Sequence, residues 1–84
     1  MYKTRREFWD HYQNLPQEIQ RQADKCFQLL QQDPKHPSLN FKQVGKTDWS
    51  VRINRSYRAL AFEEDGTFVW FWIGKHDEYM RRIQ

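Results

Sequence analysis

The sequence has little cysteine and no long apolar run. The first shortage argues against a protein held together by internal disulfides, and the second argues against a membrane-spanning protein. Its 84 residues include one cysteine, so no internal disulfide can form, which favours a reducing compartment. No apolar run approaches the ~20 residues that a membrane-spanning helix needs, and the first residues lack the pattern of a signal peptide. We therefore expect one cytoplasmic domain over residues 1–84, with no membrane partner.

Residues that commonly bind metals and nucleotides are also scarce. The sequence positions of His11, Cys26, His36 and His76 are far apart and lack the paired spacing of metal ligands. The three glycines do not recur in a loop that would hold phosphates. The sequence therefore predicts neither a metal site nor a cofactor. Cys26 lies on the apolar side of a predicted helix, so we expect an inert, buried thiol.

Aromatic residues, by contrast, are abundant. The chain contains four Trp, four Tyr and six Phe. A domain of this length buries only about 60–65% of its unfolded surface, so its thin core needs large side chains. Rings left outside the core are suited to stacking on the bases of RNA. The net charge of +3 permits a nucleic-acid partner but does not require one.

The N-terminal half has the spacing of two helices. Apolar residues recur at helical intervals after Thr4, and Thr4 with Glu7 has the spacing of a capping box, so we predict a helix over residues 5–14. Pro16 suits the first turn of a second helix, which the Asp33-Pro34 pair should end. A tight turn between two helices predicts an antiparallel pair.

The remaining residues have the patterns of strands. We predict strands at 39–44, 49–53, 57–62 and 67–73, with a hairpin turn at Asp65-Gly66 and a short helical turn near the C-terminus. The last strand is apolar on both faces, which predicts a central or covered strand with Phe68, Trp70 and Trp72 on one face. The expected fold is α+β: two helices on one face of a four-stranded, mainly antiparallel, curved sheet.

The hairpin at residues 49–62 has one arginine on each arm, Arg52 and Arg58. A three-residue loop at residues 54–56 would place the two arginines opposite each other on one face, whereas a two-residue loop would place them on opposite faces. Facing like charges are unfavourable unless an anion lies between them. Both arginines could also be ordinary exposed residues or partners of carboxylates, and the sequence leaves the register open.

These arginines and the C-terminal segment form a set suited to cutting RNA without a metal. The 2′-hydroxyl of RNA can attack the adjacent phosphorus if a base, an acid and cations are supplied. Arg52 and Arg58 could clamp the phosphate, and His76 could exchange protons near neutral pH. Tyr79 lies close to His76 in the sequence. The ordinary alternatives are a loop histidine held by a carboxylate and a tyrosine packed against the sheet.

Five motifs together resemble the RelE/ParE superfamily of toxins from bacterial type II toxin–antitoxin systems. In chain order they are Leu-Pro-Gln-Glu-Ile-Gln at 15–20, Asp-Pro-Lys-His-Pro-Ser-Leu at 33–39, Trp-Ser-Val-Arg-Ile at 49–53, Tyr-Arg-Ala at 57–59 and Trp-Ile-Gly-Lys-His-Asp-Glu-Tyr at 72–79. The resemblance implies a small toxin whose partner is a cognate antitoxin. Its RelE-like, YoeB-like and HigB-like branches imply an endoribonuclease that cuts mRNA on the ribosome.

The resemblance also implies roles for individual residues. Arg52 matches the catalytic arginine of the YoeB-like branch, and His76 and Tyr79 loosely match the histidine and tyrosine at the C-terminus of that branch. Together with Arg58 they form the predicted catalytic set. Lys42 and Lys46 match the lysines that the RelE-like branch has before the hairpin, and with Lys75 they are the predicted RNA-binding residues.

The sequence also departs from the YoeB-like pattern. Tyr57 stands where that branch has a histidine, and Ser38 lies near the place of its carboxylate. His76 and Tyr79 are separated by two residues rather than adjacent. Two alternatives share the expected fold: a ParE-like inhibitor of DNA gyrase that is not an enzyme, and an inactive, solitary binding module.

Overall fold

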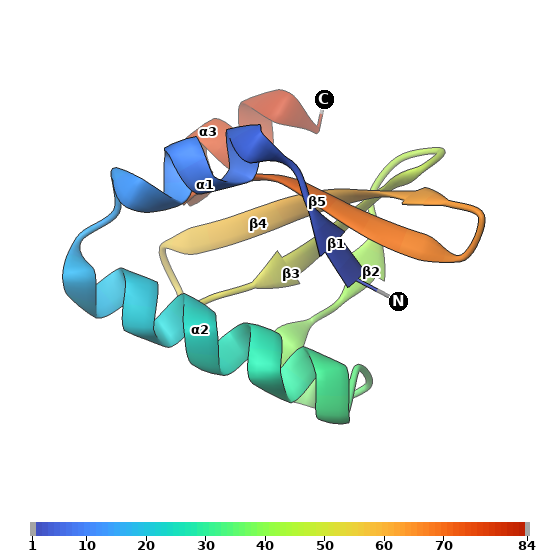
Figure 1. The fold of residues 1–84 in the computed structure, drawn as a ribbon, viewed down its shortest axis with the longest axis horizontal. Coiled ribbons are helices and arrows are strands. Elements are labelled where there is room, and N and C mark those ends of the chain that lie inside the picture. The colour runs from blue at the N-terminus through green and yellow to red at the C-terminus, as the bar shows by residue number, and fades with distance from the viewer. Residues whose placement is uncertain (1, 84) are drawn as a thin grey trace.

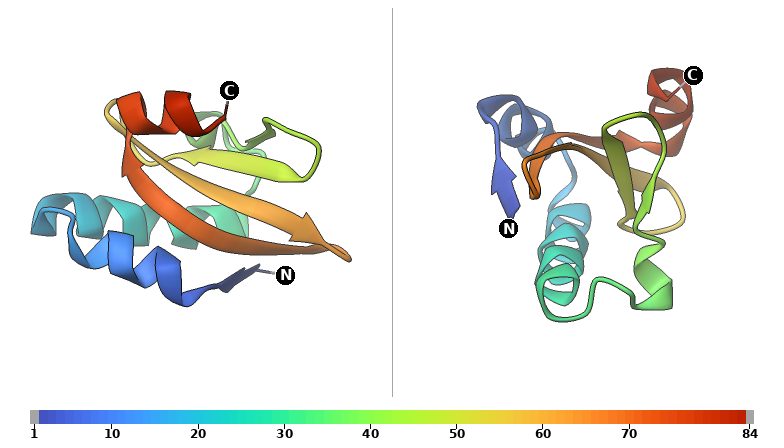
Figure 2. Two further views of the ribbon diagram at one scale, coloured as in Figure 1. Left: turned by 90° about the horizontal axis from the view of Figure 1, so that it is seen from above. Right: turned by 90° about the vertical axis from the view of Figure 1, so that its right-hand side faces the viewer.

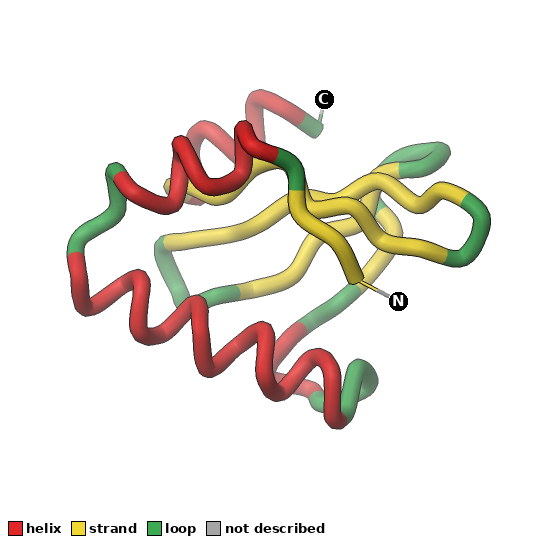
Figure 3. Tube along the Cα trace, in the orientation of Figure 1, coloured by secondary structure: helices red, strands yellow, loops and turns green. Residues whose placement is uncertain are grey.

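The protein consists of one mixed β-sheet with helices on both of its faces (Figures 1 and 3). The computed structural model describes residues 2–83. Within them the elements, in chain order, are β1 (Tyr2–Thr4), α1 (Arg6–Gln13), α2 (Gln17–Gln32), the 3₁₀ helix η1 (Pro37–Leu39), β2 (Lys42–Gln43), β3 (Asp48–Arg52), β4 (Tyr57–Glu64), β5 (Thr67–Lys75) and α3 (His76–Arg82). The strands lie in the order β1-β5-β4-β3-β2.

The expectation of a four-stranded sheet is wrong, because β1 adds a fifth strand parallel to β5. Tyr2 pairs with Phe68 and their rings stack with centroids 5.7 Å apart. The amide of Arg5 then donates to the carbonyl of Trp70 at 2.9 Å. Three residues are too few to show a period of two, and it is the free edge of β5 that provides their backbone partners. The resulting sheet is mixed rather than mainly antiparallel.

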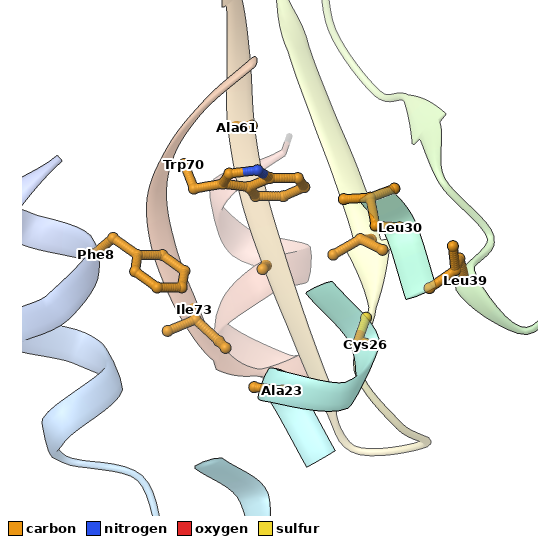
Figure 4. Packing of buried hydrophobic residues seen from close by; sticks show 10 residues of the cluster. Phe8, Ala23, Cys26, Leu30, Leu39, Ala61, Trp70 and Ile73 are labelled. Atoms are coloured by element: carbon orange, nitrogen blue, oxygen red, sulfur yellow. The ribbon is translucent and has the colours of Figure 1, made fainter. Parts of the chain in front are cut away.

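The two N-terminal helices pack side by side on one face of the sheet, and α3 lies on the other (Figure 2). The α1–α2 face of the sheet carries Val51, Ala59, Ala61, Trp70 and Ile73, which form one buried cluster with Phe8, Ala23, Cys26, Leu30 and Leu39 (Figure 4). The α3 face carries Ser50, Arg52, Arg58, Leu60 and Trp72, and a smaller cluster joins Leu60 and Trp72 to Tyr79. The predicted antiparallel pair of helices is confirmed.

The helix boundaries match the prediction closely, but the predicted capping box is absent. Arg5 is the N-cap residue of α1 and makes no side-chain cap. The hydroxyl of Thr4 instead accepts a hydrogen bond from the indole of Trp9 at 3.0 Å, and Glu7 pairs with Arg5 at 3.4 Å. Because α1 begins at Arg6, Thr4 lies one residue before the N-cap position, and its hydroxyl bonds to Trp9 rather than to the backbone of the helix.

A β-bulge in β5 changes which face each aromatic residue occupies. Leu60 pairs with Trp72, whereas the next residue, Ala61, pairs with Trp70, so Phe71 is an extra residue in β5. Trp70 consequently packs in the larger cluster, and Trp72 packs on the α3 face. The prediction that Trp70 and Trp72 share a face is therefore wrong, because the strict alternation stops at Phe71.

The segment predicted as a strand at 39–44 is mostly not a strand. Residues Pro37–Leu39 form η1, and Asn40 follows with a left-handed φ of 44°. Only Lys42–Gln43 pair with β3. Leu39, the last residue of η1, is buried in the larger cluster, so its apolar character reflects core packing rather than strand alternation. In residues 2–83, none of the helices combines the length and the apolar character needed to cross a membrane.

Candidate functional site

The β3–β4 hairpin places the two arginines opposite each other. Arg52 pairs in register with Arg58, which confirms the alternative with a three-residue loop at residues 54–56. The side-chain oxygen of Asn54 fixes this loop by accepting from the amides of Ser56 at 2.7 Å and Tyr57 at 3.0 Å. The side-chain amide of Asn54 also donates to Gln22 of α2. Turn chemistry at Asn54 therefore determines that the two guanidinium groups share the α3 face.

Arg58 is held in place by the backbone of this turn. Its Nη1 donates to the carbonyl of Asn54 and, at 3.0 Å, to the carbonyl of Tyr57. Partial burial, followed by the positive charge of Arg52, lowers the pKa of Arg58 below the ordinary arginine value, and Tyr79 opposes this shift. The lowered pKa of Arg58 thus reflects partial burial first and the like charge of Arg52 in the same site second.

The side chain of Arg52 is exposed, whereas its backbone is held by a contact with α2. Its carbonyl accepts a hydrogen bond from the thiol of Cys26 on α2, with a sulfur–oxygen distance of 3.4 Å. Burial raises the pKa of this thiol to about 12, so Cys26 is a protonated core residue. The helix pair thus fixes the position from which Arg52 projects on the opposite side of the sheet.

Neither arginine has a carboxylate partner among residues 2–83. The ion pairs of this part of the chain join Arg5 to Glu7 and Arg82 to Glu78. The expectation that Arg52 and Arg58 are ordinary salt-bridge residues is therefore not met there. Two facing cations without counter-charge form a natural site for an anion.

The helix α3 brings the predicted histidine and tyrosine to the same place. The amide of His76, the first residue of α3, donates to the carbonyl of Ser56 at 2.8 Å, which ties α3 to the hairpin loop. The centroids of the His76 and Tyr79 rings are 5.7 Å apart. The Tyr79 ring is buried, and its hydroxyl donates to the hydroxyl of Ser50 at 3.1 Å. Tyr79 therefore has both a packing role and a polar end beside the arginines.

A second set of contacts holds α3 against the sheet. The indole of Trp72 donates to Glu78 at 2.9 Å, and the guanidinium of Arg82 lies 5.0 Å from the centroid of the Trp72 ring. Arg82 also pairs with Glu78 at 3.5 Å. Because Trp72 is fully buried, these contacts orient α3 on a rigid support.

These groups line a pocket of about 250 Å³ on the α3 face, which we call the arginine pocket. It is lined by five predicted residues, Lys42, Arg52, Arg58, His76 and Tyr79, and by five that sequence reasoning missed, Asn40, Val44, Ser50, Met80 and Ile83. The alternation of the hairpin could have indicated Ser50, which shares a face with Arg52. Nothing in the sequence places Asn40, Met80 or Ile83 there, because their positions depend on η1 and α3.

Two predicted lysines lie outside the arginine pocket. Lys46 is in the exposed turn after β2, where its carbonyl accepts from the side chain of Gln43 at 2.8 Å. Lys75, at the end of β5, lines a neighbouring hollow together with His76. Of the three predicted RNA-binding lysines, only Lys42 lines the arginine pocket.

No three side chains of His, Cys, Asp or Glu gather as a possible metal site within the described part of the chain. The polar side chains that line the arginine pocket are instead cations, an imidazole, two hydroxyl groups and the amide of Asn40. This combination can bind a phosphate, move a proton and donate hydrogen bonds to a developing oxyanion.

Comparison with known proteins identifies the fold and the family of this chain. A family model described as ParE-like toxin domain matches residues 17–81. No curated protein matches the chain in sequence. The fold is similar to a chain of the RelB–RelE antitoxin–toxin complex from Methanococcus jannaschii, with 10% identity, coverage of 98% of this chain and 99% of that chain, and a TM-score of 0.74.

Two further solved structures have the same fold. YafQ from E. coli strain BL21(DE3) is 8% identical, with coverage of 94% of this chain and 96% of that chain and a TM-score of 0.71. The YoeB/ParE toxin from Agrobacterium tumefaciens is 14% identical, with coverage of 89% and 96% and a TM-score of 0.67. These likenesses establish the fold, and the family model covers most of the sequence. The chain therefore belongs to the family of ParE-like toxin domains, within the RelE/ParE superfamily of toxins.

Proposed function

We propose that this toxin is a metal-independent endoribonuclease that cuts mRNA on the ribosome and so inhibits translation in the cytoplasm. The observation that carries the proposal is the arginine pocket, in which Arg52 and Arg58 face each other beside His76. A phosphodiester relieves the repulsion between the two guanidinium groups, and histidine is the side chain best suited to exchange a proton near neutral pH.

The proposed reaction uses the substrate's own hydroxyl as nucleophile. The 2′-oxygen forms a bond to the adjacent phosphorus and loses its proton, while the bond from phosphorus to the 5′-oxygen breaks and that oxygen gains a proton. The products are a 2′,3′-cyclic phosphate and a 5′-hydroxyl. His76 transfers protons, while Arg52 and Arg58 stabilise the charge that develops on the phosphoryl oxygens.

Tyr79 and Lys42 have supporting roles in this proposal. The Tyr79 hydroxyl, which donates to Ser50 in the free protein, is positioned at the pocket wall to donate to a phosphate oxygen instead. Lys42 on β2 pairs with Ser50 on β3, so it adds positive charge to the wall of the arginine pocket that Ser50 and Tyr79 form. The ribosome would supply a message held in a fixed conformation.

The second part of the proposal is that a cognate antitoxin binds and neutralises this toxin. Two structures of the same fold come from RelB–RelE complexes, one from Methanococcus jannaschii and one from Pyrococcus horikoshii OT3. An uncompensated cationic pocket suits an antitoxin segment that carries carboxylates, because such a segment provides the missing counter-charge.

The test is to incubate the purified protein with ribosomes programmed with a defined message and to map new ends by primer extension. We expect cuts at defined positions within codons, and none with Arg52→Ala. Cutting that survives Arg52→Ala would show that the arginine pocket is not the active site. An intact message together with DNA breaks and blocked gyrase would favour the ParE-like alternative, and harmless expression without an antitoxin would favour an inactive binding module.

A further inference from the structure

A second hollow lies at the end of the sheet, next to the arginine pocket. It has a volume of about 540 Å³ and is lined by Arg55, Ser56, Tyr57, Lys75, His76 and Asp77. We call it the turn pocket, because the β3–β4 loop and the start of α3 form it. His76 lines both pockets, so the two hollows meet at the residue whose side chain the proposed reaction uses.

The turn pocket carries an excess of positive charge. Arg55 and Lys75 are exposed, and neither forms an ion pair with a carboxylate in residues 2–83. Asp77 is the one carboxylate in its lining. Two cations against one carboxylate leave capacity to bind one phosphate, as in the arginine pocket but at a more open position.

Tyr57 offers an aromatic surface beside these cations. It pairs in register with Lys75, so the two side chains lie next to each other on one face. Its ring is half-buried and packs against neither of the two core clusters of residues 2–83. A ring without a core role, flanked by cations, has the composition of a platform on which a base stacks while the adjacent phosphate is neutralised.

We infer that the turn pocket binds the nucleotide adjacent to the cleaved phosphodiester, with its base on Tyr57 and its phosphate between Arg55 and Lys75. The inference rests on the proposed function, because it assumes that RNA occupies the arginine pocket and passes over His76. The strand would then follow the two hollows around the end of the sheet, and the ligand of the turn pocket is one nucleotide of single-stranded RNA.

The experiment measures binding of a fluorescein-labelled 2′-O-methyl RNA hexanucleotide, which has no free 2′-hydroxyl and so remains uncut. Six versions each lack the base at one position. We expect wild-type affinity to fall by about 5- to 150-fold for one of these positions, the range for loss of one base stack. Tyr57→Ala should bind the complete probe equally weakly and lose nothing further at that position, while Tyr57→Phe, which keeps the ring, should resemble wild type.

A salt series tests the phosphate contact separately. In Arg55→Gln/Lys75→Gln the slope of log affinity against log salt should be shallower by about 0.7, the value for one phosphate contact on a single strand. The matched control is Arg21→Gln/Lys35→Gln, which removes two exposed cations outside both pockets and should leave the slope unchanged. Circular dichroism confirms that each variant is folded.

The outcomes separate this inference from the proposed function. If Arg52→Ala weakens binding but Tyr57→Ala and the double variant bind like wild type, the turn pocket is not a nucleotide site and the arginine pocket stands. If the wild-type protein does not bind the probe, or binds all six base-deleted versions as well as the complete one, the inference is overturned, and cleavage on programmed ribosomes still decides the proposed function. If Arg52→Ala binds the probe like the wild type, RNA does not occupy the arginine pocket, and the proposed function fails together with the inference.

Discussion

The two faces of the sheet differ in what their side chains do. The α1–α2 face carries Val51, Trp70 and Ile73, each at most 1% exposed, and packs them against the helix pair. The α3 face has a small cluster of Leu60, Trp72 and Tyr79, and beside it two arginines without carboxylate partners in residues 2–83. One face supplies most of the apolar burial, and the other presents the polar and charged groups of the arginine pocket.

This difference shows how an 84-residue chain can hold two facing cations. Partial burial of Arg58 and the charge of Arg52, which together lower the pKa of Arg58, are unfavourable for folding, and apolar burial on the opposite face offsets them. Asn54 and Cys26 connect the faces: the first fixes the loop and contacts Gln22 of α2, and the second contacts the backbone of Arg52. Substitutions on the two faces should therefore affect different properties.

The largest effect is expected on the α3 face, from His76→Ala. Loss of the group proposed to transfer protons should slow cleavage on programmed ribosomes by about 10²- to 10⁴-fold. Single-turnover cleavage rates check this expectation. The control is His36→Ala, whose imidazole contacts Ser38 in the loop after α2. Equal losses in the two variants would contradict the role given to His76.

The next effect is on stability and belongs to the α1–α2 face. Leu30 is 1% exposed, so Leu30→Ala should lower the free energy of unfolding by about 2–5 kcal/mol, through lost apolar burial and a new cavity. Urea denaturation measures the change. Met80→Ala on α3 is the comparison, because Met80 is 42% exposed and its replacement should change the value by less than about 0.5 kcal/mol. Similar costs at the two positions would remove the distinction between the faces.

A smaller loss of stability is expected at Gly74, which lies opposite Arg58 on the α3 face. A Cβ atom there would lie 2.5 Å from Cζ2 of Trp72, so Gly74→Ala must displace a buried ring and should cost about 1–3 kcal/mol. Gly45→Ala is the control, since the nearest side-chain atom would be 3.4 Å away, at Asp48. Thermal unfolding of both variants decides the point, and equal midpoints would show that the Trp72 ring moves aside freely.

The smallest effect has the opposite sign. Arg52→Ala removes the charge that repels Arg58, so it should stabilise the fold, by no more than about 0.5 kcal/mol, and added salt should diminish the gain. Urea denaturation at low and high ionic strength tests this. A clear loss of stability would mean that Arg52 contributes packing or pairing that outweighs the repulsion.

The sequence contained enough information for the helices and the hairpin. The spacing around Phe8 and the position of Pro16 located α1 and α2 within one or two residues. Asp65 and Gly66 both have positive φ, as their hairpin turn requires. These features are local, so a short window of residues determines them. The loop at residues 54–56 was also recognised, although its length was left open.

The features that were mispredicted depend on distant contacts. The bulge at Phe71 arises from pairing between β4 and β5, and the parallel pairing of β1 depends on the free edge of β5. Leu39 and Asn40 resembled the start of a strand, but the core beneath η1 determines their conformation. For the same reason the lining of the arginine pocket was predicted only in part. Its residues on β3 and β4 follow from strand alternation, whereas Met80 lines the pocket only because α3 packs against the sheet.

The chemical nature of the RNA ends tests the central claim most directly. Fragments made by the wild-type protein on programmed ribosomes can be examined by mass spectrometry. Attack by the 2′-hydroxyl in the arginine pocket predicts 5′-hydroxyl ends and 2′,3′-cyclic phosphate ends, and neither should form with Arg52→Ala. Fragments with 5′-phosphate ends, or cyclic phosphate ends that persist in Arg52→Ala, would contradict the account.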